Sequence, residues 1–124
     1  GKEFNKPIID LKKEKEEQNR KEFATIMEEL KKTSKQVDIN EAKRLRTEIM
    51  TMAVSLRKRE PHSEQDFKNI ISAHDDYEAL ISKTGMTNGV IDEDYAFIIQ
   101  VYRNCSARGQ FDSRSGCRKM EDQL

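Results

Sequence analysis

The sequence predicts an all-α protein with a long charged N-terminal helix, a small three-helix bundle and an irregular C-terminal tail. Apolar residues recur three and four apart from Ala42 to Tyr102, which is the period of an amphipathic helix. The eleven residues from Lys12 to Glu22 carry no hydrophobic side chain, so that stretch has nothing to bury. Charged residues make up 37% of the chain and only five glycines and two prolines occur, a balance typical of long helices.

Residues 1–38 form the predicted charged arm. Its polar run contains strong helix formers whose charges alternate at three and four spacing, so it can be helical while exposed on every side. Apolar residues then follow at the a and d spacing of a coiled coil for about two heptads. We predict that they mediate self-association, although they can instead pack onto the C-terminal unit of the same chain. These residues are Phe23, Met27, Leu30 and Val37.

Residues 39–105 form the predicted three-helix unit, and its first helix follows a break at Asp38. Asp38 reads as the N-cap, with Glu41 able to reach back, or Asn40 caps one register later. Glu60-Pro61 ends this helix after a basic run that suits its C-terminal dipole. Its apolar stripe consists of Ala42, Leu45, Ile49, Met52, Ala53 and Leu56.

The second and third helices have their own start signals. Ser63 with Asp66 forms an S-x-x-D start, and Gly85 suits the left-handed C-cap position. Asp92 is the predicted cap of the third helix. The second stripe holds Phe67, Ile70, Ile71, His74, Tyr77, Leu80 and Ile81, and the third holds Tyr95, Phe97, Ile98, Ile99, Val101 and Tyr102.

After Asn104 the periodicity fades, and residues 106–124 are predicted to form a flexible tail. Cys105 and Cys117 are the two cysteines, and neither belongs to a C-x-x-C pair. We expect free thiols in a cytoplasmic protein, with a disulfide loop as the alternative.

No catalytic motif is recognisable, so we predict a non-enzymatic protein with no cofactor, no metal and no small-molecule substrate. A phosphate loop, an H-E-x-x-H motif and paired-cysteine zinc spacing are all missing. His62 lies in a turn and His74 on an apolar stripe, where a core or interface role is usual. The loop before Asp92 resembles an EF-hand only around Gly89, because Thr84, Met86 and Tyr95 stand where ligand oxygens are needed.

Basic residues on the helix 41–59 offer a second interpretation, a small helical nucleic-acid-binding protein, as does the basic tail. Residues 41–60 carry six basic and three acidic groups. Against this, residues 61–102 carry two basic and eight acidic groups, and the whole chain has no net charge. The candidate phosphate contacts are Arg44, Arg46, Arg57, Lys58 and Arg59.

No run of about 18 apolar residues occurs, so we expect no membrane span in this chain. It opens with Gly1 and not Met, which suggests a tag remnant or a segment of a longer parent that can carry an anchor. We expect a location in the cytoplasm of a bacterial host, or at its membrane if the parent is anchored.

Four segments carry a resemblance to a protein family. They are L-R-T-E-I-M from Leu45, L-R-K-R-E-P-H-S-E-Q-D-F from Leu56, I-I-S-A-H-D-D-Y-E-A-L from Ile70 and F-I-I-Q-V-Y from Phe97. Roughly residues 40 to 104 resemble small uncharacterised proteins of phages and integrated elements of Gram-positive bacteria. In those proteins a charged coiled-coil front, often behind one membrane helix, precedes a short helical unit with a similar H-S-x-x-x-F step. The resemblance implies a phage accessory protein and carries over no catalytic residue.

Together these observations predict an accessory protein that self-associates through its N-terminal helix and presents the helical unit to a protein partner.

Overall fold

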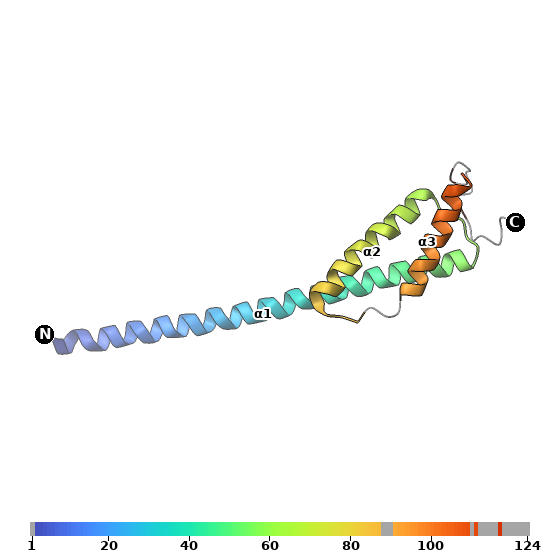
Figure 1. Ribbon diagram of the computed structural model, residues 1–124. Coiled ribbons are helices and arrows are strands. Elements are labelled where there is room, and N and C mark those ends of the chain that lie inside the picture. Colours follow the sequence, from blue (N-terminus) through green and yellow to red (C-terminus); the bar gives the residue numbers. More distant parts are fainter. Residues whose placement is uncertain (1, 88–90, 110, 112–116, 118–124) are drawn as a thin grey trace. The chain divides into compact units, whose positions relative to one another are not determined.

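The computed structural model describes residues 2–87, 91–109, 111 and 117, with side chains from residue 9 onward. Three α-helices account for most of these residues: α1 spans Lys2–Arg57, α2 spans Glu64–Thr84 and α3 spans Asp92–Ala107 (Figure 1). Within the described part, the one β-type pairing is an isolated antiparallel bridge between His62 and Cys117. The prediction of an all-α protein is confirmed.

The contacts divide the chain into two compact units. Unit 1 is Gly1–Val37 and unit 2 is Asp38–Leu124. Unit 1 contains only helical backbone of α1 in its described part, and every side chain described in it is exposed. Unit 2 contains the end of α1 together with α2 and α3, and it holds the buried core.

The predicted helix break at Asp38 is wrong, because α1 continues through this residue to Arg57. Neither glycine nor proline occurs between Pro7 and Pro61, and a single aspartate inside a helix costs only a few tenths of a kcal/mol. Asp38 also has a partner in unit 2, since its carboxylate lies 2.9 Å from the Lys83 ammonium. A sequence typical of a helix start therefore lies inside α1. The side chain expected to cap that start, Asp38, instead pairs with Lys83 of α2.

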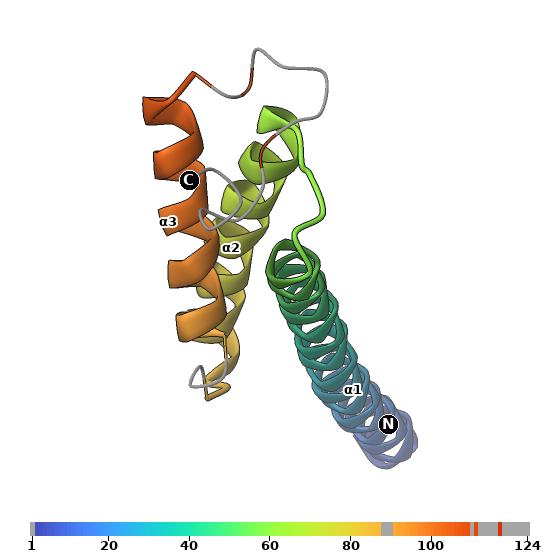
Figure 2. The ribbon, with the colours of Figure 1, turned by 90° about the vertical axis from the view of Figure 1, so that its right-hand side faces the viewer.

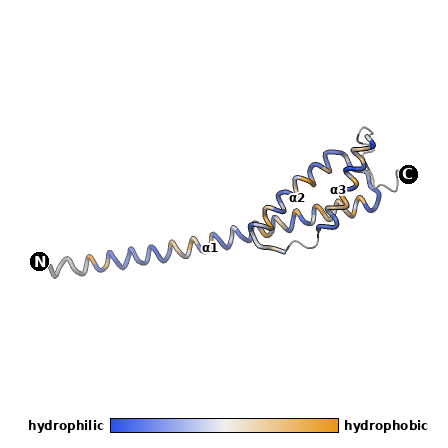
Figure 3. The backbone as a smooth tube through the Cα atoms, in the orientation of Figure 1, coloured by the Kyte–Doolittle hydropathy of each residue, from blue (hydrophilic) through white to orange (hydrophobic). Residues whose placement is uncertain are grey.

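One hydrophobic core joins the three helices of unit 2. Figure 2 shows α2 and α3 beside each other, and in Figure 3 apolar positions recur along both. The stripe predicted for residues 42–56 is confirmed at all six positions, whose exposure is 5% or less. On α2 and α3 the buried members are Phe67, Ile70, Ala73, Tyr77, Ile98, Val101 and Cys105, joined by Ile91 and Cys117.

The start and end of α2 follow the sequence signals. Ser63 is the N-cap, its hydroxyl accepts from Asp66 N, and the Asp66 carboxylate accepts from Ser63 N. Gly85 adopts φ 74° and donates its N–H to Ile81 O. These contacts satisfy backbone groups that a helix terminus otherwise leaves without a partner.

The start of α3 differs from the prediction. Asp92 is the first helical residue, and the N-cap position belongs to Ile91, which makes no side-chain cap. Ile91 is fully buried in the core of unit 2. Packing of this isoleucine, and not a local cap, therefore sets where α3 begins. The acidic first turn still suits the positive end of the helix dipole.

The end of α1 is a Schellman-type turn with arginine in the position that favours glycine. Arg59 has φ 67°, Arg59 N donates to Leu56 O at 3.0 Å, and Glu60 N donates to Ser55 O at 3.1 Å. A left-handed conformation costs a residue with a Cβ about 1 kcal/mol or more.

We therefore expect Arg59→Gly to raise the free energy of unfolding of unit 2 by up to about 1 kcal/mol. Arg59→Ala is the matched control, because alanine loses the same side chain but keeps the Cβ. Urea denaturation of both variants measures the difference. Equal stability of the two variants would contradict the proposed backbone cause.

The two cysteines do not remain free thiols as expected, because Cys105 and Cys117 form a disulfide with their Cα atoms 5.9 Å apart. Both are buried, at 0% and 1% exposure. His62 and Cys117 also exchange two backbone hydrogen bonds of 2.8 and 2.9 Å. Most of the predicted flexible tail, 106–124, lies outside the described residues, but α3 includes its first two residues and Cys117 belongs to the core.

Candidate self-association surface

The four residues predicted for self-association lie in unit 1 with their side chains in solvent. Phe23 is 65% exposed, Met27 37%, Leu30 57% and Val37 60%. Because residues three and four apart share one face of a helix, they form a single apolar stripe. From residue 9 to residue 37 every side chain of unit 1 is exposed, so the stripe is a surface available to another molecule.

Ile26 belongs to the same stripe and was not among the predicted residues. It is 63% exposed and lies three residues after Phe23 and four before Leu30. Its spacing of three and four residues to these neighbours carries the signal for it, because residues three and four apart share one face of a helix. We call these five residues, 23, 26, 27, 30 and 37, the apolar stripe.

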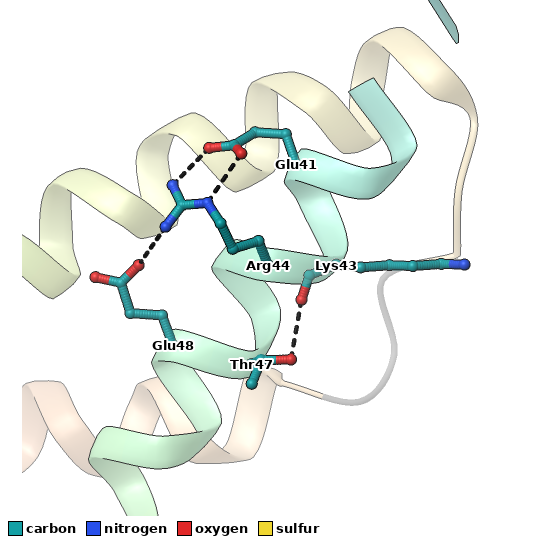
Figure 4. Close-up of polar contacts among 5 residues, drawn as sticks. All are labelled: Glu41, Lys43, Arg44, Thr47 and Glu48. Carbon is teal, nitrogen blue, oxygen red and sulfur yellow. Dashed lines mark hydrogen bonds and ion pairs between the residues drawn. The ribbon is translucent and has the colours of Figure 1, made fainter. Parts of the chain in front are cut away.

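The basic residues predicted to contact phosphates lie in unit 2, and one of them, Arg44, forms ion pairs with two glutamates. Its guanidinium contacts Glu41 at 2.6 Å and Glu48 at 3.3 Å, as Figure 4 shows. Hydrogen bonding from Arg44 lowers the pKa of the Glu41 carboxyl, and Glu41 in turn raises the pKa of Arg44. A phosphate at Arg44 would compete with two carboxylates on the same helix.

Arg46 and Arg57 bind groups of α2 and α3. Arg46 donates to the Tyr77 hydroxyl at 3.0 and 3.2 Å, and its guanidinium lies 5.6 Å from the centre of the Tyr77 ring. Arg57 pairs with Asp94 at 2.7 Å and lies 4.9 Å from the centre of the Phe97 ring. Both arginines therefore connect α1 to its neighbours across the core.

Lys58 and Arg59 are exposed at the end of α1. Arg57, Lys58 and Arg59 are consecutive, whereas Arg44 and Arg46 lie about three helical turns earlier on α1. Three of the five candidates, Arg44, Arg46 and Arg57, contact acidic or aromatic side chains of unit 2. Their charge therefore has a structural role.

A hydrogen-bonded group that the sequence did not reveal joins α1 to α2. Ser55 Oγ lies 2.7 Å from His62 Nε2, and His62 Nδ1 lies 3.2 Å from Asp66 Oδ2. The atom order is that of a nucleophilic triad, but Ser55 and Asp66 each have a further partner. Ser55 Oγ also donates to Glu60 Oε2 at 3.1 Å, and Asp66 serves the Ser63 cap.

These contacts indicate that the hydrogen-bonded group of Ser55, His62 and Asp66 stabilises the turn between α1 and α2. A serine hydroxyl has one proton, so donation to Glu60 competes with donation to the imidazole of His62. Ser55, His62 and Asp66 line an open groove, and Lys58 and Asn69 line it as well. Only the fold brings them together, because Ser55 lies in the last turn of α1, His62 lies between the helices and Asp66 lies in the first turn of α2.

His74 also has partners on its own helix and on α3. Its ring stacks on Tyr95 with the centroids 3.5 Å apart, and Nε2 lies 3.2 Å from Glu78 Oε1. Burial raises the pKa of the Tyr95 hydroxyl, and the nearby Asp75 charge adds to the shift. His74 packs between α2 and α3, in agreement with its place on the apolar stripe of α2.

Among the described residues, no three His, Cys, Asp or Glu side chains come together as a metal site, and no helix has the length and apolar content to cross a bilayer. The EF-hand-like loop falls partly outside those residues, at 88–90. Comparison with known proteins gave no match: no protein family, no curated protein and no solved structure is detectably similar to this chain.

Proposed function

We propose that this protein is a non-enzymatic oligomerisation and protein–protein interaction module. The observation that carries the proposal is the apolar stripe of unit 1, whose members are 37% to 65% exposed. Burying such side chains against a second molecule yields roughly 1.5–3 kcal/mol each. A second copy of the chain is the simplest partner, because it carries the same stripe and can form a two-stranded coiled coil.

Unit 2 is the proposed presenting element. Its helices, which we propose pack as a small three-helix bundle, bury their stripes in one core and leave charged side chains on the surface. We propose that a protein partner binds this surface. The resemblance of residues 40 to 104 to phage and integrated-element proteins supports an accessory role in such an element.

A nucleic-acid-binding function has weaker support. Arg44, Arg46 and Arg57 already have partners within unit 2, and the partner of Arg57 is the acidic Asp94 of α3. Affinity for phosphates comes from several basic groups acting together, and a phosphate at Arg44 or Arg57 would compete with carboxylates already paired there.

The disulfide between Cys105 and Cys117 bears on the cellular compartment of the protein. The bacterial cytoplasm that the sequence predicts keeps thiols reduced, so a lasting bond between Cys105 and Cys117 weighs against it. Alkylating free thiols in intact host cells before lysis, followed by mass measurement, distinguishes the two locations. Two alkyl groups on the chain indicate the cytoplasm, and none indicates an oxidising compartment.

The self-association proposal is tested on the full chain by light scattering across a range of concentrations. We expect a mass of at least two chains at high concentration and dissociation on dilution, because the stripe covers only about two heptads. A mass of one chain at every concentration would remove self-association from the proposed function.

A further inference from the structure

The apolar stripe of unit 1 has a central line of residues and one further apolar residue on each side of that line. Phe23, Leu30 and Val37 recur seven residues apart, so they form the central line along α1. Successive residues of an α-helix are rotated by about 100°, so Ile26 lies about 60° to one side of Phe23 and Met27 about 40° to the other. The stripe is therefore about 100° wide in this part of the helix.

One partner helix does not cover a stripe of this width. The seam between two paired helices is formed by two neighbouring lines of side chains, the a and d positions. Such a seam is narrower than the face of about 100° or more that a helix buries against several neighbours. A partner that covers the central line and Met27 leaves Ile26 in solvent, and one that covers the central line and Ile26 leaves Met27 there. A pair therefore leaves one apolar residue of each copy uncovered.

The area of the stripe also favours more than one neighbour. Its five side chains are 37% to 65% exposed, and burying an apolar side chain removes on the order of 100 Å² from water. A pair that covers four of the five on each copy buries roughly 800 Å² of this surface in total. A stable, specific interface buries at least about 1,000 Å². Three copies that cover all five side chains bury roughly 1,500 Å².

We propose that unit 1 assembles with at least two further copies of the chain, so that each copy contacts two neighbours. The inference rests on the proposed self-association and adds the number of copies. In such an assembly the central line faces the common axis, and both Ile26 and Met27 contact a neighbouring copy. A closed ring of copies leaves neither side of the stripe uncovered, whereas a pair does.

The second heptad of the stripe allows this arrangement. Thr33 and Ser34 take the positions that Ile26 and Met27 hold one heptad earlier, and both are small and uncharged. A neighbouring helix can therefore approach on either side without burying a charge. Toward the N-terminus Glu16 continues the central line, so the contact is confined to about two heptads.

Sedimentation equilibrium of the full chain measures the number of copies. We expect the mass to rise with concentration to that of three or more chains and to fall on dilution, because the contact is short. A mass that levels off at two chains would overturn the proposal and leave self-association intact. A mass of one chain at every concentration would overturn both.

A substitution on one side of the stripe tests the proposed cause. Ile26→Gln keeps a strong helix former but removes the apolar side chain on that side, while the central line and Met27 remain. We expect binding of the third copy to weaken by more than about tenfold. The mass should therefore level off at two chains at concentrations at which the native assembly is complete. Met27→Gln makes the same change on the other side and should have the same effect.

Thr25→Gln is the matched control, because Thr25 is exposed on the opposite face of α1. This variant should keep the mass of the native assembly, and circular dichroism checks that every variant keeps its helical signal. An Ile26→Gln chain that assembles like the native chain would overturn the proposal. So would an Ile26→Gln chain that is monomeric at those concentrations, because Ile26 would then belong to the single seam of a pair.

Discussion

The Leu30→Glu chain should be monomeric at concentrations at which the native chain self-associates. Leu30 lies at the centre of the apolar stripe and is 57% exposed, so glutamate there costs the folded monomer little. In a pair, both copies lose a burial of roughly 1.5–3 kcal/mol, and two carboxylates then face each other. The loss of about 3 kcal/mol or more corresponds to a weakening of more than a hundredfold.

Light scattering and circular dichroism together measure this effect. The mass should fall to that of one chain while the helical signal of unit 2 persists. Val54→Glu is the matched control, because Val54 is an exposed apolar residue of α1, at 47%, that lies outside the stripe. If both variants dissociate alike, or neither does, the stripe is not the contact.

Reduction of the disulfide should lower the stability of unit 2 by about 3 kcal/mol. Cys105 and Cys117 are twelve residues apart, and closing a loop of this size restricts the unfolded chain by about that amount. The bond also holds Cys117 where it exchanges backbone hydrogen bonds with His62. For a unit of this size the melting temperature should fall by roughly 10 °C or more.

Tyrosine fluorescence during heating, with and without a reducing agent, measures this loss. All three tyrosines belong to unit 2, so the signal reports on that unit and not on unit 1. A chain with Cys105→Ser and Cys117→Ser serves as the control and should melt near the reduced native protein, unaffected by the reducing agent. An unchanged melting temperature on reduction of the native chain would show that the bond contributes no stability.

Much of the candidate surface could be predicted from spacing. Phe23, Leu30 and Val37 are exposed and recur seven residues apart, and Ile26 could have been included because it lies three residues after Phe23 and four before Leu30. Local rules also predicted the Ser63 cap and the Gly85 C-cap, because the bonds of a helix terminus are made within a few residues.

Other features could not be predicted from neighbouring residues. The sequence around Asp38 was typical of a helix start. In the structure the Asp38 carboxylate pairs with Lys83, which is far along the chain, and α1 continues through Asp38. Ser55 lies near His62 and Asp66 only because of the turn between α1 and α2. Arg46 donates a hydrogen bond to Tyr77 of α2, and Arg57 pairs with Asp94 of α3. Each outcome depends on a pair of groups that the fold brings together.

By itself the sequence determined that the chain is helical and which residues form the core stripe of 42–56. Period and local capping suffice for these properties, because helix hydrogen bonds and helix faces repeat within four residues. Only the tertiary structure decided that α1 passes through Asp38, that Ile91 sets the start of α3 and that Cys105 reaches Cys117. These depend on packing between distant segments, where burial and pairing outweigh small local preferences.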